Sequence, residues 1–577
     1  MNELPSNPLK SVLKPSLLRE KDSRRRLFLP AEAINSICNQ VTVHEELLRY
    51  YFEPDAIKLA GHVCSTEKPA REVFSILVLV DKVNCIHRFC DAGILDDDLP
   101  LGSSDQNTEL WSRHSTVNEP LLSGNSPEDT DMIEIFYEKQ WSVHVPVFDF
   151  GSSENQRPGH YQFDEGTIMP WVSLGNKIET GGYGTVEKLK IHTGHYHLIR
   201  HNTFALKILL SDIEDPRTYF WQEITAVRKL RRGPHLVELV ATIEIAECQF
   251  MFIFPWAEGG ALEDLITQKH LNRIGENLLS HEFICWVLDQ CRGLVEALET
   301  IHFTRTDSIY QSDGDLDKDY GLHLDIKPSN ILYFSQETET SPFGILKLAD
   351  CGLMEFHSLA SRSRKSVTGC SAGPRTYRLP ENDFNHTISK KDDVWAMCCV
   401  FTEFLTWAIL PHGSVDEYRL ARTQEPSVTS ARQENRNNYE NSFFQHFLQY
   451  EVTDGAVVSV PELATQTDHI SWHVRARQTS SNTWRLDSDE FRIAEIPKLK
   501  SSVSQWIAKL ISQRQYETEP GSIMKFLAFI KKKMMHPERV QRADCQRILE
   551  FFKEHLDKAD IRIKEPPSSN DNWFGAR

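Results

Sequence analysis

The feature that most limits how this chain can fold is a lysine inside an apolar strand. Phe204-Ala-Leu-Lys207-Ile208 reads as a hydrophobic strand that Lys207 interrupts. A lysine in such a strand is costly unless its charge is paired. We therefore expect Lys207 to have a carboxylate partner, and the binding of phosphates would supply a reason for its charge.

Two neighbouring segments could supply the carboxylate and the phosphate-binding loop. Upstream, residues 178–186 (Ile-Glu-Thr-Gly-Gly-Tyr-Gly-Thr-Val) form a glycine cluster flanked by apolar and β-branched residues, as in a hairpin. Downstream, residues 221–230 have helical spacing and place Glu223 as a candidate partner for Lys207. A glycine loop, a strand lysine and a helix glutamate in this order resemble the amino-terminal lobe of the eukaryotic protein-kinase family.

The remaining motifs of that family follow in the same order. Residues 322–334, with Asp325, Lys327 and Asn330, are similar to the catalytic loop. Residues 345–353 contain Asp350 and are similar to the metal-binding strand and turn. Three later segments resemble the end of the activation segment, the helix that anchors the catalytic loop and the last arginine motif: 377–381, 391–397 and 535–542. The resemblance covers residues 175–555.

The resemblance implies an enzyme that transfers a phosphoryl group from ATP to Ser or Thr hydroxyls of protein substrates. Asp325 would orient and deprotonate the hydroxyl, and Lys327 would stabilise the transferred group. Lys207, held by Glu223, would position the α- and β-phosphates. A lysine two positions after the aspartate is the form typical of Ser/Thr kinases.

The resemblance also implies where ATP and Mg²⁺ bind. Asn330 and Asp350 would hold Mg²⁺, and Phe254 would be the gatekeeper of the hinge. The residues expected to contact the nucleotide are Ile178, Gly181, Gly184, Val186, Ala205, Lys207, Phe254, Trp256, Ala257 and Leu332.

Several residues depart from the family's pattern. Glu179 replaces the first glycine of the loop, and Cys351 replaces the phenylalanine after the metal-binding aspartate. Pro374 stands where a threonine often lies ahead of Tyr377. Leu324 replaces the catalytic-loop arginine, which predicts that phosphorylation of the activation loop is not the main switch. Since no group that performs chemistry is lost, we favour an active enzyme over the alternative, a weak or inactive pseudokinase that acts as a binding or scaffold protein.

The implied fold is α+β and bilobal, with a small β-rich amino-terminal lobe and a large helical carboxyl-terminal lobe. The kinase domain would occupy residues 170–555, with inserts at about 303–320 and 411–497. Within the second insert, residues 414–438 are expected to be polar and mobile, and the apolar residues of 443–448 to form a helix.

The amino-terminal part is expected to differ from this domain. Apolar residues at helix-like intervals predict a mainly helical extension over residues 28–165, with a polar loop over 101–130. Residues 1–27 and 556–577 have the composition of disordered tails. A protein partner could bind through residues 28–165 or 411–497.

Composition limits the partners and the compartment. With 64 Lys+Arg against 82 Asp+Glu, the net charge of −18 argues against charge-driven nucleic-acid binding. The longest apolar run, residues 73–80, is too short to span a bilayer. The 12 cysteines include no Cys-x-x-Cys pair, and the first residues lack a signal-peptide core. We expect an intracellular protein, cytoplasmic, with the nucleus also compatible.

Two further patterns bear on relatives and on metal sites. Residues 401–407 and 503–507 resemble a group of filamentous-fungal Ser/Thr kinases that have a similar helical extension. His192, His195, His197 and His201 have a spacing that a metal site would permit. Because they precede Lys207 in a connection between strands and no cysteine is near, we expect an exposed polar loop there instead.

Overall fold

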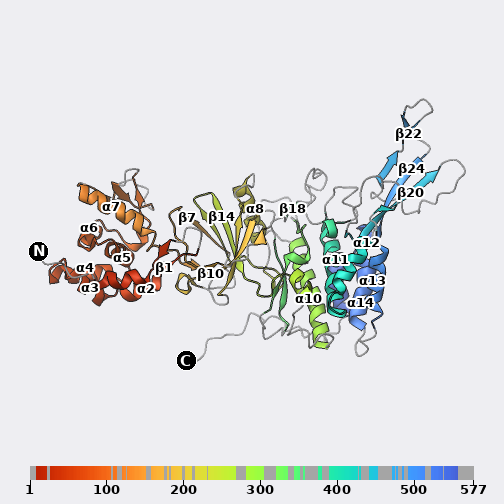
Figure 1. The fold of residues 1–577 in the computed structure, drawn as a ribbon, viewed down its shortest axis with the longest axis horizontal. Coiled ribbons are helices and arrows are strands. Elements are labelled where there is room, and N and C mark those ends of the chain that lie inside the picture. Colours follow the sequence, from red (N-terminus) through yellow and green to blue (C-terminus); the bar gives the residue numbers. More distant parts are fainter. Residues whose placement is uncertain are drawn as a thin grey trace, which may run out of the picture. The chain divides into compact units, whose positions relative to one another are not determined.

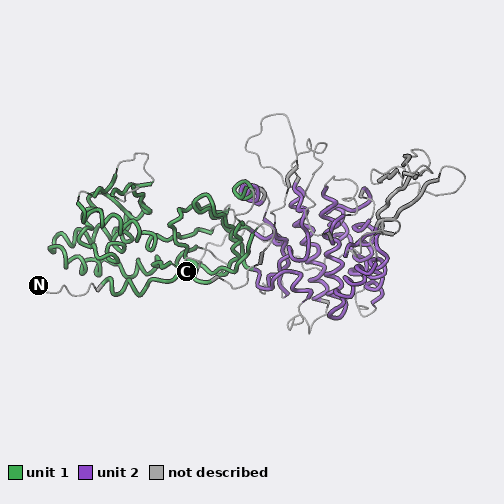
Figure 2. Tube along the Cα trace, turned by 45° about the horizontal axis from the view of Figure 1, so that its top comes forward, with its two compact units in different colours: residues 1–220, 239–256 green, residues 221–238, 257–577 purple. Residues whose placement is uncertain are grey.

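The computed structural model falls into two compact units, residues 1–220 with 239–256 and residues 221–238 with 257–577 (Figure 2). The structure describes residues 8–21, 26–104, 108–113, 120–124, 126–150, 158–174, 179–180, 184–197, 202–210, 215–229, 232–267, 281–303, 320–335, 343–350, 355–357, 375–379, 389–425, 428–429, 441–452, 471–474, 476–478, 484–486, 491–513, 521–536 and 539–555.

The first unit begins with a segment that we call the extension, residues 8–146 (Figure 1). Its helices surround one apolar core, in which Phe74, Leu77, Phe89 and Phe136 are fully buried. The central helix is α5, because every residue from Val73 to Val78 is buried. The helices are α1 (Pro8–Leu13), α2 (Ala31–Ile37), α3 (Gln40–Leu47), α4 (Glu53–Val63), α5 (Arg71–Leu79), α6 (Ile86–Asp91) and α7 (Pro127–Gln140).

Side-chain caps explain where several of these helices begin. The Asn39 side chain accepts hydrogen bonds at the start of α3, and the Ser126 side chain does so at the start of α7. Asp96 caps α5 from a distant turn, because its Oδ1 accepts from the backbone N–H groups of Glu72 and Val73. Burial, followed by the nearby charge of Glu72, raises the pKa of Asp96 to about 6.

The prediction of a disordered tail over residues 1–27 is wrong for the described part. Residues 8–13 form α1, and the strands β1 (Leu18–Arg19) and β2 (Leu27–Phe28) form an antiparallel pair. Leu9 and Leu13 pack into the core of the extension, so this segment gains enough apolar burial to be ordered.

The predicted polar loop over residues 101–130 is also wrong in its described residues. Strands β3 (Gly102–Ser103), β4 (Glu109–Trp111) and β5 (Leu122–Ser123) form a small antiparallel sheet, and α7 begins within the same range. Leu110 and Leu122 join the core of the extension. Single apolar residues among many polar ones are a weak sequence signal, although two of them suffice here to fix short strands.

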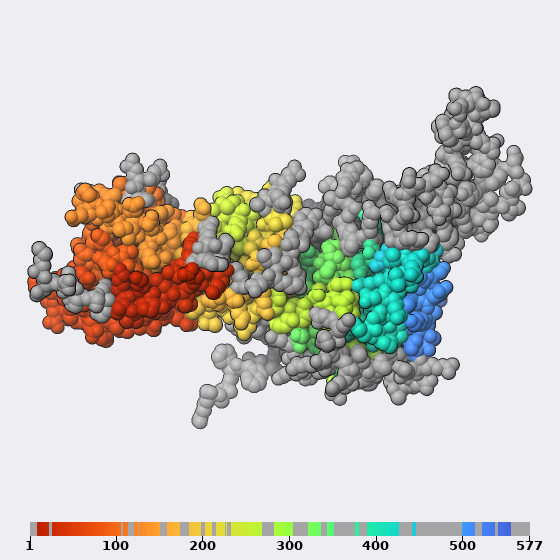
Figure 3. Space-filling model, in the orientation of Figure 1, coloured from red at the N-terminus to blue at the C-terminus, as the bar shows by residue number. Residues whose placement is uncertain are grey.

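The extension is held to the rest of the first unit by a buried carboxylate and an arginine. Glu20 is fully buried, and its carboxylate accepts from the Met169 backbone N–H at 2.8 Å and from Arg26 Nε at 3.2 Å. Arg26 also donates to the carbonyl oxygens of Gly166 and Thr167, at 2.8 and 2.7 Å. Figure 3 shows the start of the chain, in red, beside the yellow surface of the sheet that follows.

A histidine makes the second attachment. His195, expected to be exposed, is buried, because its ring packs edge-on against Phe28. Its Nδ1–H donates to the Pro146 carbonyl at 2.9 Å, and its Nε2 accepts from the Ala31 N–H at 3.1 Å. Burial lowers the pKa of His195 to about 4, so the ring is neutral at pH 7 and can both donate and accept.

The rest of the first unit is a curved sheet. Strands neighbour one another in the order β7-β13-β14-β12-β10-β8, and β9 pairs with β10. β7 runs parallel to β13, with Gly159 opposite Ala241, so the segment before the expected kinase domain adds a strand to the sheet. The strands are β7 (Gly159–Phe163), β8 (Trp171–Leu174), β9 (Glu179–Thr180), β10 (Gly184–Ile191), β12 (Phe204–Leu209), β13 (Ala241–Ile245) and β14 (Gln249–Pro255).

The second unit is mainly helical. Its core is built around α11, in which nearly every residue is buried, including Asp393 and Glu403. The two-stranded sheet of β16 (Ile331–Phe334) and β17 (Ile345–Leu348) packs on this core. The main helices are α9 (Leu262–Thr267), α10 (His281–His302), α11 (Lys390–Ile409), α12 (Ser414–Gln424), α13 (Ser501–Ile511), α14 (Gly521–Phe529) and α15 (Cys545–His555), and most of α8 (Pro216–Lys229) also belongs here.

The region from α12 to the strands that follow it corrects two predictions. We call the strands between α12 and α13 the arm (Val428–Leu499). β20 (Phe444–Val452) and β24 (Phe491–Leu499) pair antiparallel over their full length, where the sequence was expected to form a helix. Alternating β-branched, aromatic and polar residues suit a strand once a partner is present. Residues 414–424, expected to be polar and mobile, form α12, because Val415, Tyr418 and Arg422 are buried along one face.

Two predicted segments lie where the structure describes no residues. Residues 304–319 of the first predicted insert and the predicted tail 556–577 lie outside the described residues. Among the helices that the structure describes, none has the length and apolar character needed to cross a membrane.

Candidate active site

The first unit brings several predicted nucleotide-contacting residues onto one face of the sheet. Lys207 on β12 lies opposite Val186 on β10 and Phe252 on β14, and Ala205 lies opposite Phe254. Directly opposed residues of antiparallel strands share a face, as do residues two apart on one strand. The Lys207 ammonium lies 5.7 Å from the centroid of the Phe252 ring.

The glycine loop and the hinge are described in part. Gly184 begins β10, and a Cβ there would lie 2.7 Å from the Ile208 carbonyl, so only glycine fits without a shift. Trp256 follows β14, and its backbone N–H donates to the Thr203 carbonyl. The Lys188 ammonium lies over the Trp256 ring, 5.0 Å from its centroid. Ile178 and Gly181 lie outside the described residues.

Two predicted residues of the nucleotide region belong to the second unit. Glu223 lies on α8 and is 3 % exposed, and Ala257 is also buried. Since Lys207 belongs to the first unit, the pairing of Lys207 with Glu223 stays a prediction.

The second unit brings three predicted residues of the catalytic loop together. Lys327 Nζ donates to Asp325 Oδ2 at 2.7 Å. The Asn330 side-chain amide donates to the same Oδ2 and to the Asp325 carbonyl, both at 2.8 Å. The other carboxylate oxygen, Oδ1, is buried and has no hydrogen-bond partner among the described residues. Asp325 is therefore held through one oxygen and keeps the other available as a proton acceptor.

The backbone of this loop is fixed by Asp393 of α11. Its carboxylate accepts from the backbone N–H groups of His323 and Leu324, both at 2.9 Å. Leu324 has φ 65°, a left-handed conformation that costs energy for a residue with a branched side chain. The hydrogen bond to Asp393 stabilises this conformation, and it uses the backbone N–H and not the side chain at position 324.

Two residues that the sequence did not single out complete this support. His302, at the end of α10, lies 2.9 Å from Asp393 through Nε2, and Cys545 Sγ lies 3.4 Å from His302 Nδ1. Burial alone would raise the pKa of Asp393, but hydrogen bonds and charges from His302 and His323 outweigh it and lower that pKa. Cys545 is 243 residues from His302, so no local pattern could reveal this cluster.

One backbone hydrogen bond brings the two predicted metal-binding residues, Asn330 and Asp350, close together. The Ala349 N–H donates to the Asn330 carbonyl at 2.8 Å, and Asp350 follows with φ 62° and an exposed side chain. His323 Nε2–H donates to the Ala349 carbonyl at 3.0 Å and holds this turn against the catalytic loop. Leu332 lies on β16, bridged to Ala261.

The donor set in this unit fits Mg²⁺, which prefers a few oxygen ligands. The Asn330 amide nitrogen points to Asp325, so its Oδ1 is left without a protein donor among the described residues. Asn330 and Asp350 would supply oxygens of the right kind. In the described part of the chain no group of three or more His, Cys, Asp or Glu side chains forms a ready-made metal site.

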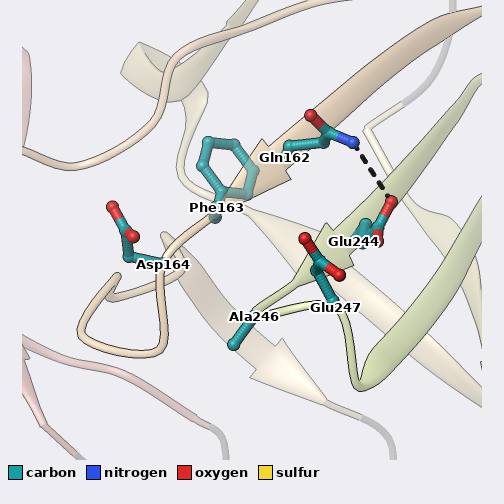
Figure 4. A pocket seen from close by; sticks show the side chains of 6 residues that line it. All are labelled: Gln162, Phe163, Asp164, Glu244, Ala246 and Glu247. Atoms are coloured by element: carbon teal, nitrogen blue, oxygen red, sulfur yellow. Dashed lines mark hydrogen bonds between the residues drawn. The ribbon is translucent and has the colours of Figure 1, made fainter. Parts of the chain in front are cut away.

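A separate open pocket of about 520 Å³ lies in the first unit at the end of β7 and β13 (Figure 4). Its walls include Asp164, Glu244 and Glu247. Glu244 accepts from Gln162 at 3.2 Å and lies 3.8 Å from Arg217 at the start of α8, so its charge already has a protein partner. This pocket contains none of the predicted catalytic residues.

Comparison with known proteins agrees with this arrangement. Residues 172–550 match the family described as protein kinase domain. The chain is 24 % identical over 295 residues to tyrosine-protein kinase SPK-1 of Girardia tigrina, covering 50 % of each chain. It is 28 % identical over 237 residues to the probable LRR receptor-like serine/threonine-protein kinase RPK1 of Arabidopsis thaliana (41 % of this chain, 36 % of the relative). It is also 26 % identical over 269 residues to cyclin-dependent kinase E-1 of the same plant (46 % and 50 %).

The chain thus spans half or less of the length of these curated relatives. The family match covers more of the chain, because residues 172–550 include the strands from β9 to β14, the catalytic loop, the helices from α9 to α14 and the start of α15. The chain belongs to the protein kinase domain family.

Proposed function

We propose that this protein transfers the γ-phosphoryl group of ATP to Ser or Thr hydroxyls of protein substrates. The observation that carries the proposal is the state of Asp325, which is bound through Oδ2 to Lys327 and Asn330 and keeps Oδ1 without a partner among the described residues. Oδ1 would accept the hydroxyl proton while Lys327 neutralises charge on the transferred group. Catalysis would depend on positioning and electrostatics more than on covalent chemistry.

The remaining predicted residues would bind the nucleotide and the metal. Asn330 and Asp350 would hold Mg²⁺, which supplies charge neutralisation at the phosphates. Lys207, with Glu223 as its partner, would hold the α- and β-phosphates. The apolar face with Val186 and Ala205 would cover the adenine, with Ile178, Gly181 and Gly184 in the loop and Phe254, Trp256, Ala257 and Leu332 at the hinge and floor.

The preference for Ser and Thr rests on Lys327, two positions after Asp325. The similar proteins include both a tyrosine kinase and a serine/threonine kinase, so the preference for Ser and Thr is part of the proposal. We also propose the division into an extension and a kinase domain over 170–555, a likeness to filamentous-fungal kinases, and a cytoplasmic location with the nucleus also compatible. The extension predicted over 28–165 corresponds to residues 8–146, because β7 joins the sheet.

The support of the catalytic loop bears on the alternative of a pseudokinase. Leu324 lacks the arginine side chain of the family's pattern, yet its backbone N–H reaches Asp393 at 2.9 Å. The groups that would perform chemistry are therefore held in place in spite of this substitution, which favours activity.

A phosphate-transfer assay on the full chain tests the proposal. With labelled ATP and Mg²⁺, the wild type should label Ser- and Thr-containing peptides, and Asp325→Asn should lower the rate by about 100-fold or more, since it removes the proton acceptor. Asp55→Asn, an exposed substitution on α4, serves as the matched control and should leave the rate unchanged. Equal labelling by wild type and Asp325→Asn, with Mg²⁺ and with Mn²⁺, would support the pseudokinase instead. Labelling of tyrosine peptides alone would refute the Ser/Thr preference.

A further inference from the structure

The segment Arg375–Tyr377 is tied to the core of the second unit by one side chain. Tyr377 Oη donates to Glu403 Oε2 at 3.1 Å. Burial, followed by the nearby charge of Glu403, raises the pKa of Tyr377, so the phenol keeps the proton that it donates. Tyr377 stands in the part of the chain that resembles the end of the activation segment.

Glu403 is held in turn by two arginines of α12. It is fully buried, and its Oε1 accepts from Arg422 Nη2 at 2.5 Å while its Oε2 accepts from Arg419 Nη2 at 2.7 Å. Burial alone would raise the pKa of Glu403, but Arg422 and Arg419 outweigh it and lower that pKa. The carboxylate is therefore ionised, and its two oxygens are fixed in direction by charge-assisted hydrogen bonds.

Arg422 joins this carboxylate to the base of the arm. Its guanidinium lies between the Tyr418 and Phe443 rings, 4.2 and 4.0 Å from their centroids. Its Nε donates to Asn441 Oδ1 at 2.9 Å, and its carbonyl accepts from Lys500 Nζ at 2.9 Å. Asn441 and Phe443 lead into β20, and Lys500 follows β24, so both ends of the hairpin meet at Arg422. We call Asn441, Phe443 and Lys500 the arm root.

The connection continues on two sides. Arg419 makes a bidentate pair with Glu263 of α9, at 2.7 and 2.9 Å. Glu425, after α12, accepts from the backbone N–H groups of Ser501 and Ser502 at the start of α13. Through Arg419 and Arg422, α12 joins the carboxylate that receives Tyr377 to α9 and to the arm root, and the end of α12 is bonded to the start of α13.

We propose that the arm root positions the segment 375–379, which would bind the protein substrate: Asn441 fixes Arg422, Arg422 fixes Glu403, and Glu403 fixes Tyr377. Arg422 and Asn441 are positioning residues, because their side-chain hydrogen bonds among the described residues of the second unit go to Glu403 and to each other and not to Asp325, Lys327 or Asn330. The inference rests on the proposed function and adds to it a role for the arm, namely control of how the protein substrate is held.

We call the chain of contacts from Asn441 through Arg422 and Glu403 to Tyr377 the path. A double-mutant cycle on the full chain tests it. The variants are Tyr377→Phe, Asn441→Leu and the combination, measured with a Ser/Thr peptide and with ATP. Each single variant should lower kcat/KM for the peptide by about fivefold, the effect of one lost hydrogen bond, mainly through KM for the peptide. KM for ATP should change by less than about twofold, and the double variant should resemble either single variant. Asn35→Leu, at an exposed asparagine of the extension, is the matched control.

Two results would overturn the inference. Effects that multiply in the double variant would show that Asn441 and Tyr377 act independently. An equal rise in KM for ATP would show that Asn441→Leu perturbs the whole unit.

A second measurement separates failure of this inference from failure of the proposed function. If the wild type transfers no more phosphate than Asp325→Asn, the kinase proposal fails, while hydrogen exchange of residues 375–379 still reports on the path. Faster exchange of these amides in Asn441→Leu, with Asn35→Leu unchanged, would support the path, and equal exchange in both variants would refute it.

Discussion

Two segments outside the catalytic core are attached to it by different physical means. The extension is attached mainly through side chains that bond to backbone groups, because Arg26 donates to the carbonyls of Gly166 and Thr167 and His195 bridges Pro146 and Ala31. The arm is attached through Asn441, Phe443 and Lys500 to Arg422, and the Arg422 guanidinium pairs with the buried carboxylate of Glu403. The first junction is built largely from bonds to backbone groups, whereas the second depends on a buried ion cluster.

The difference predicts different sensitivities. A backbone group can accept a bond from several side chains, so the junction of the extension should tolerate some substitutions. A buried ion cluster depends on every member, since loss of one leaves an uncompensated charge in a medium of low polarity. The four predictions that follow test this contrast, from the largest effect to the smallest.

Glu403→Leu should have the largest effect on stability. It would leave the fully buried guanidinium of Arg422 without the carboxylate that balances its charge. We expect the second unit to lose about 3–5 kcal/mol of stability. The measurement is hydrogen exchange of the α11 amides, which reports the free energy of opening for that helix.

Glu417→Leu on α12 is the matched control for this substitution. Glu417 is exposed and lies 3.9 Å from Lys509, so its loss should cost less than about 1 kcal/mol. A similar loss in both variants would mean that the ion cluster is no more important than a surface pair, and the contrast between the two junctions would fail.

Acid should weaken the junction of the extension through His195. The ring has a pKa of about 4 when folded, against an ordinary value near 6.5, so the unfolded chain binds a proton first as the pH falls. The stability from neutral His195 is therefore fully present above about pH 6.5 and is lost as the pH falls toward 4, by about 3 kcal/mol in total. Unfolding of the first unit between pH 7 and pH 4 measures this loss.

His195→Gln separates this effect from general acid denaturation. Glutamine retains a donor and an acceptor but does not titrate in this range, so the pH dependence should become shallower. His197→Gln, an exposed histidine of the neighbouring strand β11 (Tyr196–His197), is the control. Parallel pH profiles for the wild type and His195→Gln would contradict the prediction.

The catalytic loop was predictable from sequence because its chemistry lies within a few consecutive residues. Asp325, Lys327 and Asn330 are close in the chain, and the structure brings them into direct contact. Their local spacing alone restricts how they can meet. The face that holds Val186, Ala205, Lys207 and Phe254 follows from strand alternation once the strands pair.

The arm and its root could not be predicted in the same way. Phe443, Phe444 and Phe447 read as a helix face, but β24, nearly fifty residues later, supplies the partner that makes this segment a strand. Tertiary pairing of this kind overrides local pattern. Arg422 lies in the stretch predicted to be polar and mobile, and only packing shows that it and Glu403 are both fully buried.

Arg26→Leu should have an intermediate effect. It removes two bonds to carbonyl groups and the bond from Arg26 Nε to the fully buried Glu20 carboxylate, so we expect the first unit to lose about 2 kcal/mol. Hydrogen exchange of α2 measures the loss. Arg113→Leu, which breaks the more exposed pair of Arg113 with Asp164, should cost less than about 1 kcal/mol. If the two variants lose the same stability, the carbonyl bonds of Arg26 contribute nothing specific.

Salt should have the smallest effect, and it separates the two kinds of charge most directly. Both members of the Arg422–Glu403 pair are fully buried, so dissolved ions cannot approach them, and buried pairs are screened much less than exposed ones. The loss caused by Glu403→Leu should therefore differ by less than about 0.5 kcal/mol between 0.1 M and 1 M NaCl, as measured by exchange of the α11 amides. Taking the difference between variant and wild type at each concentration removes the general effect of salt on the fold. Arg547 and Glu550 form a solvent-exposed pair. The small loss of stability caused by Arg547→Leu should therefore nearly disappear at 1 M NaCl. An equally large salt dependence for Glu403→Leu would mean that water and ions reach the cluster, and the Arg422 to which the arm is attached would then not be held by a buried ion pair.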